Sequence, residues 1–165
     1  MQFGEIYYGK QGSAYILKFV GDIRYTLSCS LDNFLDRLFR QNDFCQITVD
    51  LTETTNIDST NLGLLGKIAN LMRSRFNRKP FLISTNDNVN RVLDSMGFED
   101  VFDMCGDCQH CPEAAQRVED CHASKSQMAR IMLDAHTVLC NISEHNRKEF
   151  QGVIGALQSS LAGSG

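Results

Sequence analysis

A polar tripeptide, Asp58-Ser59-Thr60, could carry a regulated chemical modification. It follows a polar loop and precedes apolar residues at helical spacing, so we expect it at the start of a helix. Asp and Ser are preferred N-cap residues, and a serine hydroxyl there lies beside unsatisfied backbone N–H groups. A phosphate on Ser59 would add a charge of about −1.5 to −2 at the positive end of the helix dipole. The tripeptide therefore indicates a helix cap, a phosphorylation site, or both.

Four cysteines within seventeen residues could act together as metal ligands: Cys105, Cys108, Cys111 and Cys121. Cys-x2-Cys spacing brings two thiolates within reach of one tetrahedral ion, so the group predicts a zinc site with four cysteine ligands, in which His110 or His122 could replace one thiol. The alternatives are a loop of reduced cysteines and an adventitious disulfide. An iron–sulfur cluster fits less well, because the usual fourth cysteine before the proline is missing.

Other candidate residues are interpreted as structural. Three further cysteines lie on expected apolar faces and are assigned to the packed core: Cys29, Cys45 and Cys140. Three carboxylates near the end of the expected sheet could in principle hold Mg²⁺: Asp50, Glu53 and Asp58. Neither a glycine-rich phosphate loop nor a nucleophile elbow accompanies them. The sequence therefore disfavours an enzyme.

Length and charge narrow the class of protein. The chain has 165 residues, enough for one domain with an appendage, and its 42% apolar and 22% charged residues are ordinary globular values. The formal net charge of −4 argues against a broad nucleic-acid footprint and against a polybasic membrane anchor. The seven cysteines are an odd number, the first residues lack signal-peptide features, and no stretch is apolar enough to span a membrane. We therefore expect a reduced, cytoplasmic protein.

Hydrophobic periodicity predicts the elements that position these residues. Strands are expected at residues 7–8, 14–20, 45–51, 81–84 and 101–102, and helices at residues 31–38, 58–72 and 89–96. Ser28 or Ser30 would cap the first helix, and Gly97 would close the third. The resulting order, ββαβαβα with a last short strand, predicts an open α/β sheet.

The pattern changes beyond residue 104. Residues 105–123 form a cysteine-bearing linker, and residues 124–161 carry apolar residues at helical spacing, which predicts one or more amphipathic helices. Asn146 falls where the apolar stripe would continue, and a lone polar residue there can set register in an oligomer. The C-terminal segment therefore either folds back onto the exposed side of its own sheet or pairs with a second copy as a homodimer.

Three motifs follow one another on the expected elements. They are Gly21-Asp22-Ile23 after the second strand, residues 49–65 around the Asp-Ser-Thr tripeptide, and residues 93–102. Together they resemble the STAS domain of anti-sigma factor antagonists, over residues 4–104. The resemblance implies a STAS-like open mixed sheet for residues 1–104, and the C-terminal extension is similar to that of a proteobacterial subgroup. Asn61 stands where the family usually has glycine, and Arg24 where a small acidic or polar residue is commoner.

The resemblance implies a non-enzymatic switch protein. The unmodified domain would bind an anti-sigma factor and thereby free the sigma factor. A serine kinase, often the anti-sigma factor itself, would phosphorylate Ser59, with Thr60 as the alternative acceptor, and a PPM-type serine phosphatase, alone or fused to a response regulator, would reverse this. The partner-binding residues would be Asp22, Asp58, Ser59, Thr60 and Asn61. The resemblance implies no cofactor, and STAS antagonists do not in general require metal.

A second function stays open on the residues alone. A STAS module could act as a scaffold or sensor, with the cysteine cluster as a metal-responsive or thiol-responsive input. Phosphate on Ser59 would favour the switch, whereas stoichiometric metal would favour the sensor.

Overall fold

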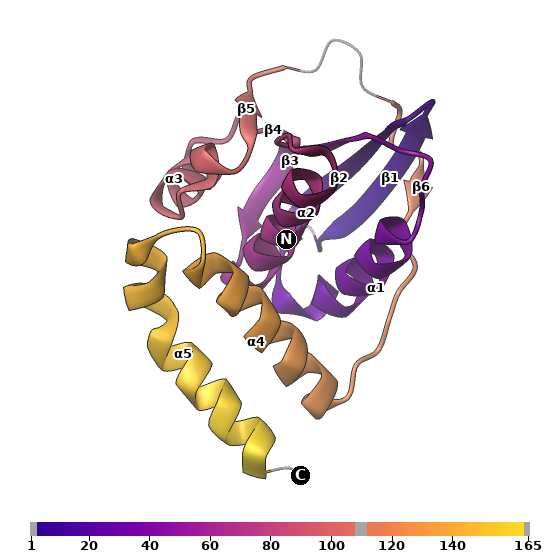
Figure 1. Ribbon diagram of the computed structural model, residues 1–165. Coiled ribbons are helices and arrows are strands. Elements are labelled where there is room, and N and C mark those ends of the chain that lie inside the picture. Colours follow the sequence, from indigo (N-terminus) through magenta and orange to yellow (C-terminus); the bar gives the residue numbers. More distant parts are fainter. Residues whose placement is uncertain (1–2, 108–111, 164–165) are drawn as a thin grey trace.

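The computed structural model describes residues 3–107 and 112–163, and its centre is a mixed sheet flanked by helices (Figure 1). The strands of these residues are β1 (Glu5–Gln11), β2 (Ala14–Ile23), β3 (Gln46–Ile57), β4 (Phe81–Ile83), β5 (Asp103–Cys105) and β6 (Gln116–Arg117). The helices are α1 (Ser28–Phe39), α2 (Ser59–Phe76), α3 (Asp87–Ser95), α4 (Lys125–Cys140) and α5 (Glu144–Gly163), with 3₁₀ turns η1 (Tyr25–Leu27) and η2 (Phe98–Asp100). The strand order is β5-β4-β3-β2-β1-β6. The predicted fold class, an α/β fold with an open mixed sheet and C-terminal helices, is confirmed.

Strand direction brings two polar loops to the same edge of the sheet. β1 and β2 form an antiparallel hairpin with Gly12 at a φ of 61° in its turn, whereas β2, β3, β4 and β5 run parallel. Ile23 at the end of β2 pairs with Ile57 at the end of β3. The loops that leave these two strands therefore lie beside each other, at the edge where parallel α/β sheets usually hold their functional residues.

The face of the sheet that carries α1 and α2 is the apolar core of the domain (Figure 1). Side chains alternate along a strand, so Ile47, Val49 and Leu51 of β3 share one face, and all three are fully buried. This confirms the predicted apolar face of the strand. The prediction that Cys45 belongs to it is wrong, because β3 begins one residue later and Cys45 is half-buried, with its thiol 3.3 Å from Ser13 Oγ.

Two predicted element ends are also wrong. The turn η1 leads directly into α1, so its N-cap position precedes Ser28 and has no capping side chain. Ser28 and Ser30 lie buried inside the helix instead. The last parallel strand begins at Asp103 rather than two residues earlier, because Phe102 is buried in the core and stacks on Phe98, with 5.3 Å between the ring centroids.

The cysteine-bearing linker connects opposite edges of the sheet. β5 lies at one edge and β6 at the other, so the chain between them must pass from one edge to the other. Residue 113 approaches β1 closely, because a Cβ on Gly9 would lie 1.8 Å from the Glu113 carbonyl oxygen. Only glycine leaves room for this approach. The sequence does not predict β6, since a two-residue strand is too short to show a periodic pattern.

The C-terminal residues form a helical hairpin, α4 and α5, which we call the C-terminal hairpin. α4 packs against α2, and α5 packs against α4 (Figure 1). The hairpin therefore folds back on its own chain, but on a helix rather than on the exposed side of the sheet. Asn146 is fully buried, and its Nδ2 donates to the Met96 carbonyl at 2.8 Å and to the Leu139 carbonyl at 2.9 Å. This asparagine thus joins α5 to α4 and to the end of α3 within one chain.

Replacement of this buried amide tests how the hairpin is held. Asn146→Ala would leave the Met96 carbonyl without its side-chain donor and remove one of the hydrogen bonds to the Leu139 carbonyl, which keeps the Ile142 N–H, so we expect the free energy of unfolding to fall by about 1–3 kcal/mol. Urea unfolding followed by circular dichroism measures this. Asn141→Ala, at an exposed position in the same hairpin, is the matched control and should change stability little. Equal stabilities for the two variants would contradict this role of Asn146.

Candidate functional site

Ser59 is the first residue of α2, and the residue before it sets its position. Asp58 has an extended backbone (φ −87°, ψ 170°) and is the N-cap, with its Oδ1 accepting from the Asn61 backbone N–H at 3.0 Å. The Asp58 N–H in turn donates to the Ile23 carbonyl at 3.1 Å, which ties this loop to the end of β2. The predicted helix cap is confirmed, and the cap is Asp58 rather than the serine.

Two opposing electrostatic effects act at this helix start, a favourable helix dipole and the carboxylate of the N-cap Asp58. α2 is 18 residues long, has no acidic residue in its first turn and carries Arg73 and Arg75 in its last turn. The N-terminal N–H groups and the positive end of the helix dipole favour negative charge beside Ser59. The two arginines interact favourably with the negative end of the dipole, at the C-terminus of α2. A phosphate on Ser59 would therefore be favoured by the helix dipole and repelled by the Asp58 carboxylate.

The Ser59 hydroxyl has a partner that the sequence does not predict. Its Oγ lies 2.8 Å from Nε2 of His136, which belongs to α4 and is 77 residues away in the chain. The other ring nitrogen, Nδ1, lies 2.6 Å from the Met132 carbonyl, which can only accept. In the neutral ring Nδ1 therefore carries the proton, and Nε2 accepts from the serine hydroxyl. His136 is only 5% exposed and its ring packs against Phe150, while Ser59 is half-buried, so this hydrogen bond is partly shielded from water.

Two glycines of α2 allow α4 to come this close. A Cβ on Gly63 would lie 2.2 Å from the Ala135 carbonyl oxygen, and a Cβ on Gly66 would lie 2.7 Å from Val138 Cγ1. The two helices thus meet backbone to backbone at Gly63, one turn after Ser59. The approach at Gly63 brings the next residue of α4, His136, to the serine.

The other predicted partner-binding residues fall into two groups. Asp22 lies at the end of β2 and accepts from Asn56 Nδ2 at 3.2 Å, next to the loop that carries Ser59. Thr60 and Asn61 are buried, with 4% and 0% exposed. The Asn61 side chain donates to Asp58 Oδ1 at 3.0 Å and accepts from Ser28 Oγ at 3.3 Å. The residue that departs from the family pattern is therefore buried and hydrogen-bonded within the domain in this conformation, and its predicted contact with a partner stays a prediction.

The serine–histidine pair has the arrangement of a nucleophile and a base, with a carbonyl orienting the base. Hydrolytic chemistry would also need a cleft that admits a substrate beside the serine. α4 supplies the histidine and also packs over the start of α2, so a substrate could reach Ser59 only after α4 moved. The same restriction applies to an enzyme that would modify the Ser59 hydroxyl and to a partner that would contact it.

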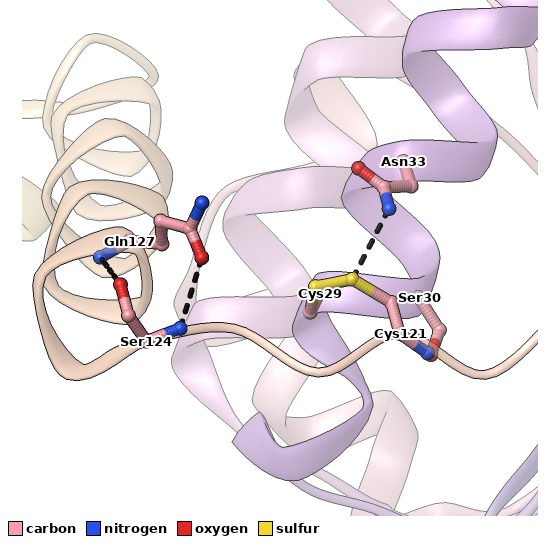
Figure 2. Close-up of a disulfide and its surroundings, with 6 residues drawn as sticks. All are labelled: Cys29, Ser30, Asn33, Cys121, Ser124 and Gln127. Atoms are coloured by element: carbon pink, nitrogen blue, oxygen red, sulfur yellow. Dashed lines mark hydrogen bonds between the residues drawn. A yellow bond between two sulfur atoms is a disulfide. The ribbon is translucent and has the colours of Figure 1, made fainter.

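The cysteines are arranged differently from the prediction. Cys29 of α1 and Cys121 form a disulfide, with 5.5 Å between their Cα atoms (Figure 2). The Cys121 N–H donates to Ser30 Oγ, and Asn33 Nδ2 donates to the Cys121 sulfur, both at 3.1 Å. Cys29 is buried as predicted, with 6% exposed, but it is not a free thiol, because its sulfur is bonded to a cysteine 92 residues away. Cys140 is buried as predicted, and burial raises the pKa of its thiol.

The predicted zinc site is only partly within the described residues. Cys108, Cys111 and the alternative ligand His110 lie outside them. Cys105 is half-buried, and Cys121 is in a disulfide, which leaves it no thiolate to bind a metal. Among residues 3–107 and 112–163, no group of three or more potential ligands could hold a metal ion. A zinc site with four cysteine ligands therefore stays a prediction for the reduced chain.

The fold and this site define an α/β domain with a capped, hydrogen-bonded serine at the carboxyl edge of its sheet. A comparison with protein families matches residues 6–111 to the STAS domain. The chain therefore belongs to the STAS domain family, whose members are generally regulatory and non-catalytic. A search of curated proteins finds no match. None of the helices in the described part of the chain is both long enough and apolar enough to cross a membrane.

A pair of glycine substitutions tests the close approach of α2 and α4. Gly63→Ala places a methyl group against the Ala135 carbonyl, so we expect a loss of about 1–3 kcal/mol in the free energy of unfolding. Gly152→Ala, in exposed helix α5 with open space around it, should instead stabilise by about 0.5–1 kcal/mol. Urea unfolding of both variants measures the difference. Stabilisation by both substitutions would contradict the close approach.

The disulfide has its own test. It closes a loop across a separation of 92 residues, so its reduction should lower the free energy of unfolding by about 2–4 kcal/mol. Urea unfolding with and without a phosphine reductant measures the effect, and peptide mapping without reductant should recover Cys29 linked to Cys121. Cys45→Ser is the control that should keep the full response to reductant. The disulfide assignment would be contradicted if the reductant did not destabilise the wild type, or if it destabilised Cys29→Ser by the same amount.

Proposed function

We propose that this protein is an anti-sigma factor antagonist in which phosphorylation of Ser59 prevents binding. The unphosphorylated form binds an anti-sigma factor and frees its sigma factor. The observation that supports this most is Ser59 itself, a capped first residue of α2 in a STAS domain, beside the loop of Asp22. A phosphate there changes the charge of a surface that combines the ends of two parallel strands and the start of a helix.

Ser59 is the better of the two candidate acceptors. It is half-buried, and Thr60 is 4% exposed. A kinase must bring the acceptor oxygen in line with the transferred phosphorus, which a buried side chain does not permit without local opening. We therefore assign the phosphate to Ser59 and keep Thr60 as the alternative.

The proposal requires two enzymes in the same compartment, which we take to be the cytoplasm. A serine kinase, which in this family is often the anti-sigma factor, adds the phosphate. A PPM-type phosphatase, alone or fused to a response regulator, removes it. The proposal assigns the chain no cofactor and no contact with nucleic acid or membrane, in keeping with its formal net charge of −4.

A sensor function is the second candidate, and the disulfide favours it. Cys29 joins the STAS core to Cys121, just before α4, so a thiol reductant would change how the C-terminal hairpin is held. Disulfides in cytosolic proteins are usually redox-sensing or catalytic rather than structural. Under this proposal the reduced cysteines could also take up zinc.

Variants at Ser59 test the switch. We expect Ser59→Ala to retain the anti-sigma factor and Ser59→Asp to bind it at least about tenfold more weakly, since a carboxylate supplies part of a phosphate's charge. Affinity purification from the native cell with quantitative mass spectrometry identifies and measures the bound partner. Phosphopeptide mapping of the wild type should find the phosphate on Ser59.

Ser74, exposed near the other end of α2, provides the matched control. Ser74→Ala and Ser74→Asp should both bind like the wild type. The switch would be wrong if the two Ser59 variants also bound like the wild type and no phosphate appeared on Ser59 or Thr60.

A further inference from the structure

α4 packs on the part of the domain that the proposed switch must expose. His136 contacts the Ser59 hydroxyl at 2.8 Å, and the backbone of Ala135 meets α2 at Gly63. Both contacts fall within the first turns of α2, where a kinase or an anti-sigma factor would have to bind. The C-terminal hairpin therefore covers the proposed modification site in the unphosphorylated chain.

We propose that docking of α4 on α2 and phosphorylation of Ser59 are mutually exclusive, so that the C-terminal hairpin is an intramolecular competitor for the partner surface. This inference rests on the proposed function only for the identity of the partner. The exclusion itself follows from the geometry of Ser59, His136 and Gly63, and it can be tested without a kinase or an anti-sigma factor.

A phosphoryl group does not fit in the closed site. Phosphorylation forms a bond from Ser59 Oγ to the γ-phosphorus of a nucleoside triphosphate and breaks that phosphorus's bond to the leaving diphosphate; the hydroxyl proton is released. With Ser59 in its observed rotamer, the phosphorus and its three added oxygens would then occupy the 2.8 Å space between Oγ and His136 Nε2. His136 cannot retreat on its own, because Nδ1 is held by the Met132 carbonyl and the ring packs on Phe150. For the phosphate to be held in this rotamer, the whole of α4 must therefore move.

The contact between α2 and α4 leaves no room for a smaller adjustment. At Gly63 the helices already touch through backbone atoms, so α4 cannot move closer there to open space at Ser59. Val138 fills the space over Gly66 in the next turn. Close-packed interfaces of this kind change between discrete arrangements rather than deform gradually.

The hairpin would remain attached to the domain after its release. The disulfide holds Cys121 on α1, and α4 begins at Lys125, so only the residues between them need to turn (Figure 2). A short tether keeps the local concentration of α4 high near its docking surface. The hairpin can therefore compete repeatedly with a partner. A partner helix that takes the place of α4 should also place a small residue over Gly63, as α4 does with Ala135.

Hydrogen exchange on the full-length protein tests the exclusion directly. Phosphoserine is installed at position 59 during translation, and exchange is followed by mass spectrometry in peptides from α4 and β3. We expect α4 to exchange at least about tenfold faster than in the unmodified protein, because a released helix of this length is only marginally stable, while β3 stays unchanged. Phosphoserine at position 74 is the matched control and should leave α4 at its original rate.

Ala135→Glu supplies an open reference, since it places a carboxylate against the backbone of α2. Ala156→Glu, on the exposed face of α5, controls for the added charge. Faster exchange in β3 would show that Ala135→Glu unfolds the domain. The exclusion would then be tested only by comparing the two phosphoserine proteins.

Unchanged exchange in α4 with phosphate on Ser59 would overturn the exclusion, as would equal acceleration in α4 and β3. If Ser59 were never phosphorylated in the native cell, the proposed function would be overturned. The exclusion measured by hydrogen exchange would not be affected.

Discussion

The backbone contact between Gly63 of α2 and Ala135 of α4 determines what the rest of this structure can do. Without a side chain at position 63, the two helices meet at a distance that no other residue would allow, since a Cβ would lie 2.2 Å from a carbonyl oxygen. That distance brings His136 to the Ser59 hydroxyl and buries their hydrogen bond. It also makes the contact all-or-none, because backbone atoms already in contact cannot yield. The STAS domain and its C-terminal hairpin are therefore coupled at the one serine that the family pattern marks.

This coupling must act in both directions. If phosphate on Ser59 disfavours docking of α4, then docking of α4 disfavours phosphorylation, and by the same free energy. The apparent affinity of any partner for this surface is likewise reduced by the fraction of molecules in which α4 is docked. Interactions remote from the serine, such as Asn146 with Met96 or the disulfide at Cys121, then affect the switch because they stabilise the docked state.

Local patterns predicted most of the sheet and the helix cap before Ser59, because those signals lie within short segments. Alternation along β3 identified its buried face, and Asp58 before a helical stripe identified the cap. The partner of Ser59 could not be predicted in the same way, since His136 is 77 residues away and nothing local distinguishes a histidine that packs from one that contacts a serine. The disulfide could not be predicted for the same reason. Cys-x2-Cys spacing suggested that Cys121 binds metal together with the cysteines near it in sequence, whereas the fold brings it to α1.

The distribution of burial explains why the hairpin, and not the domain, is the part that can move. Ten of the eighteen residues of α2 are buried, against four of sixteen in α4 and two of twenty in α5. Apolar burial provides most of the free energy that holds a helix in place, so α4 and α5 each lose less of it than α2 would if they were displaced. Glycines at positions 63 and 66 add to this difference, because they let α4 approach the backbone of α2 but offer it no side chain to bury. The same residues that bring His136 to Ser59 therefore also limit the side-chain area that holds α4, which is what the proposed release by one phosphate requires.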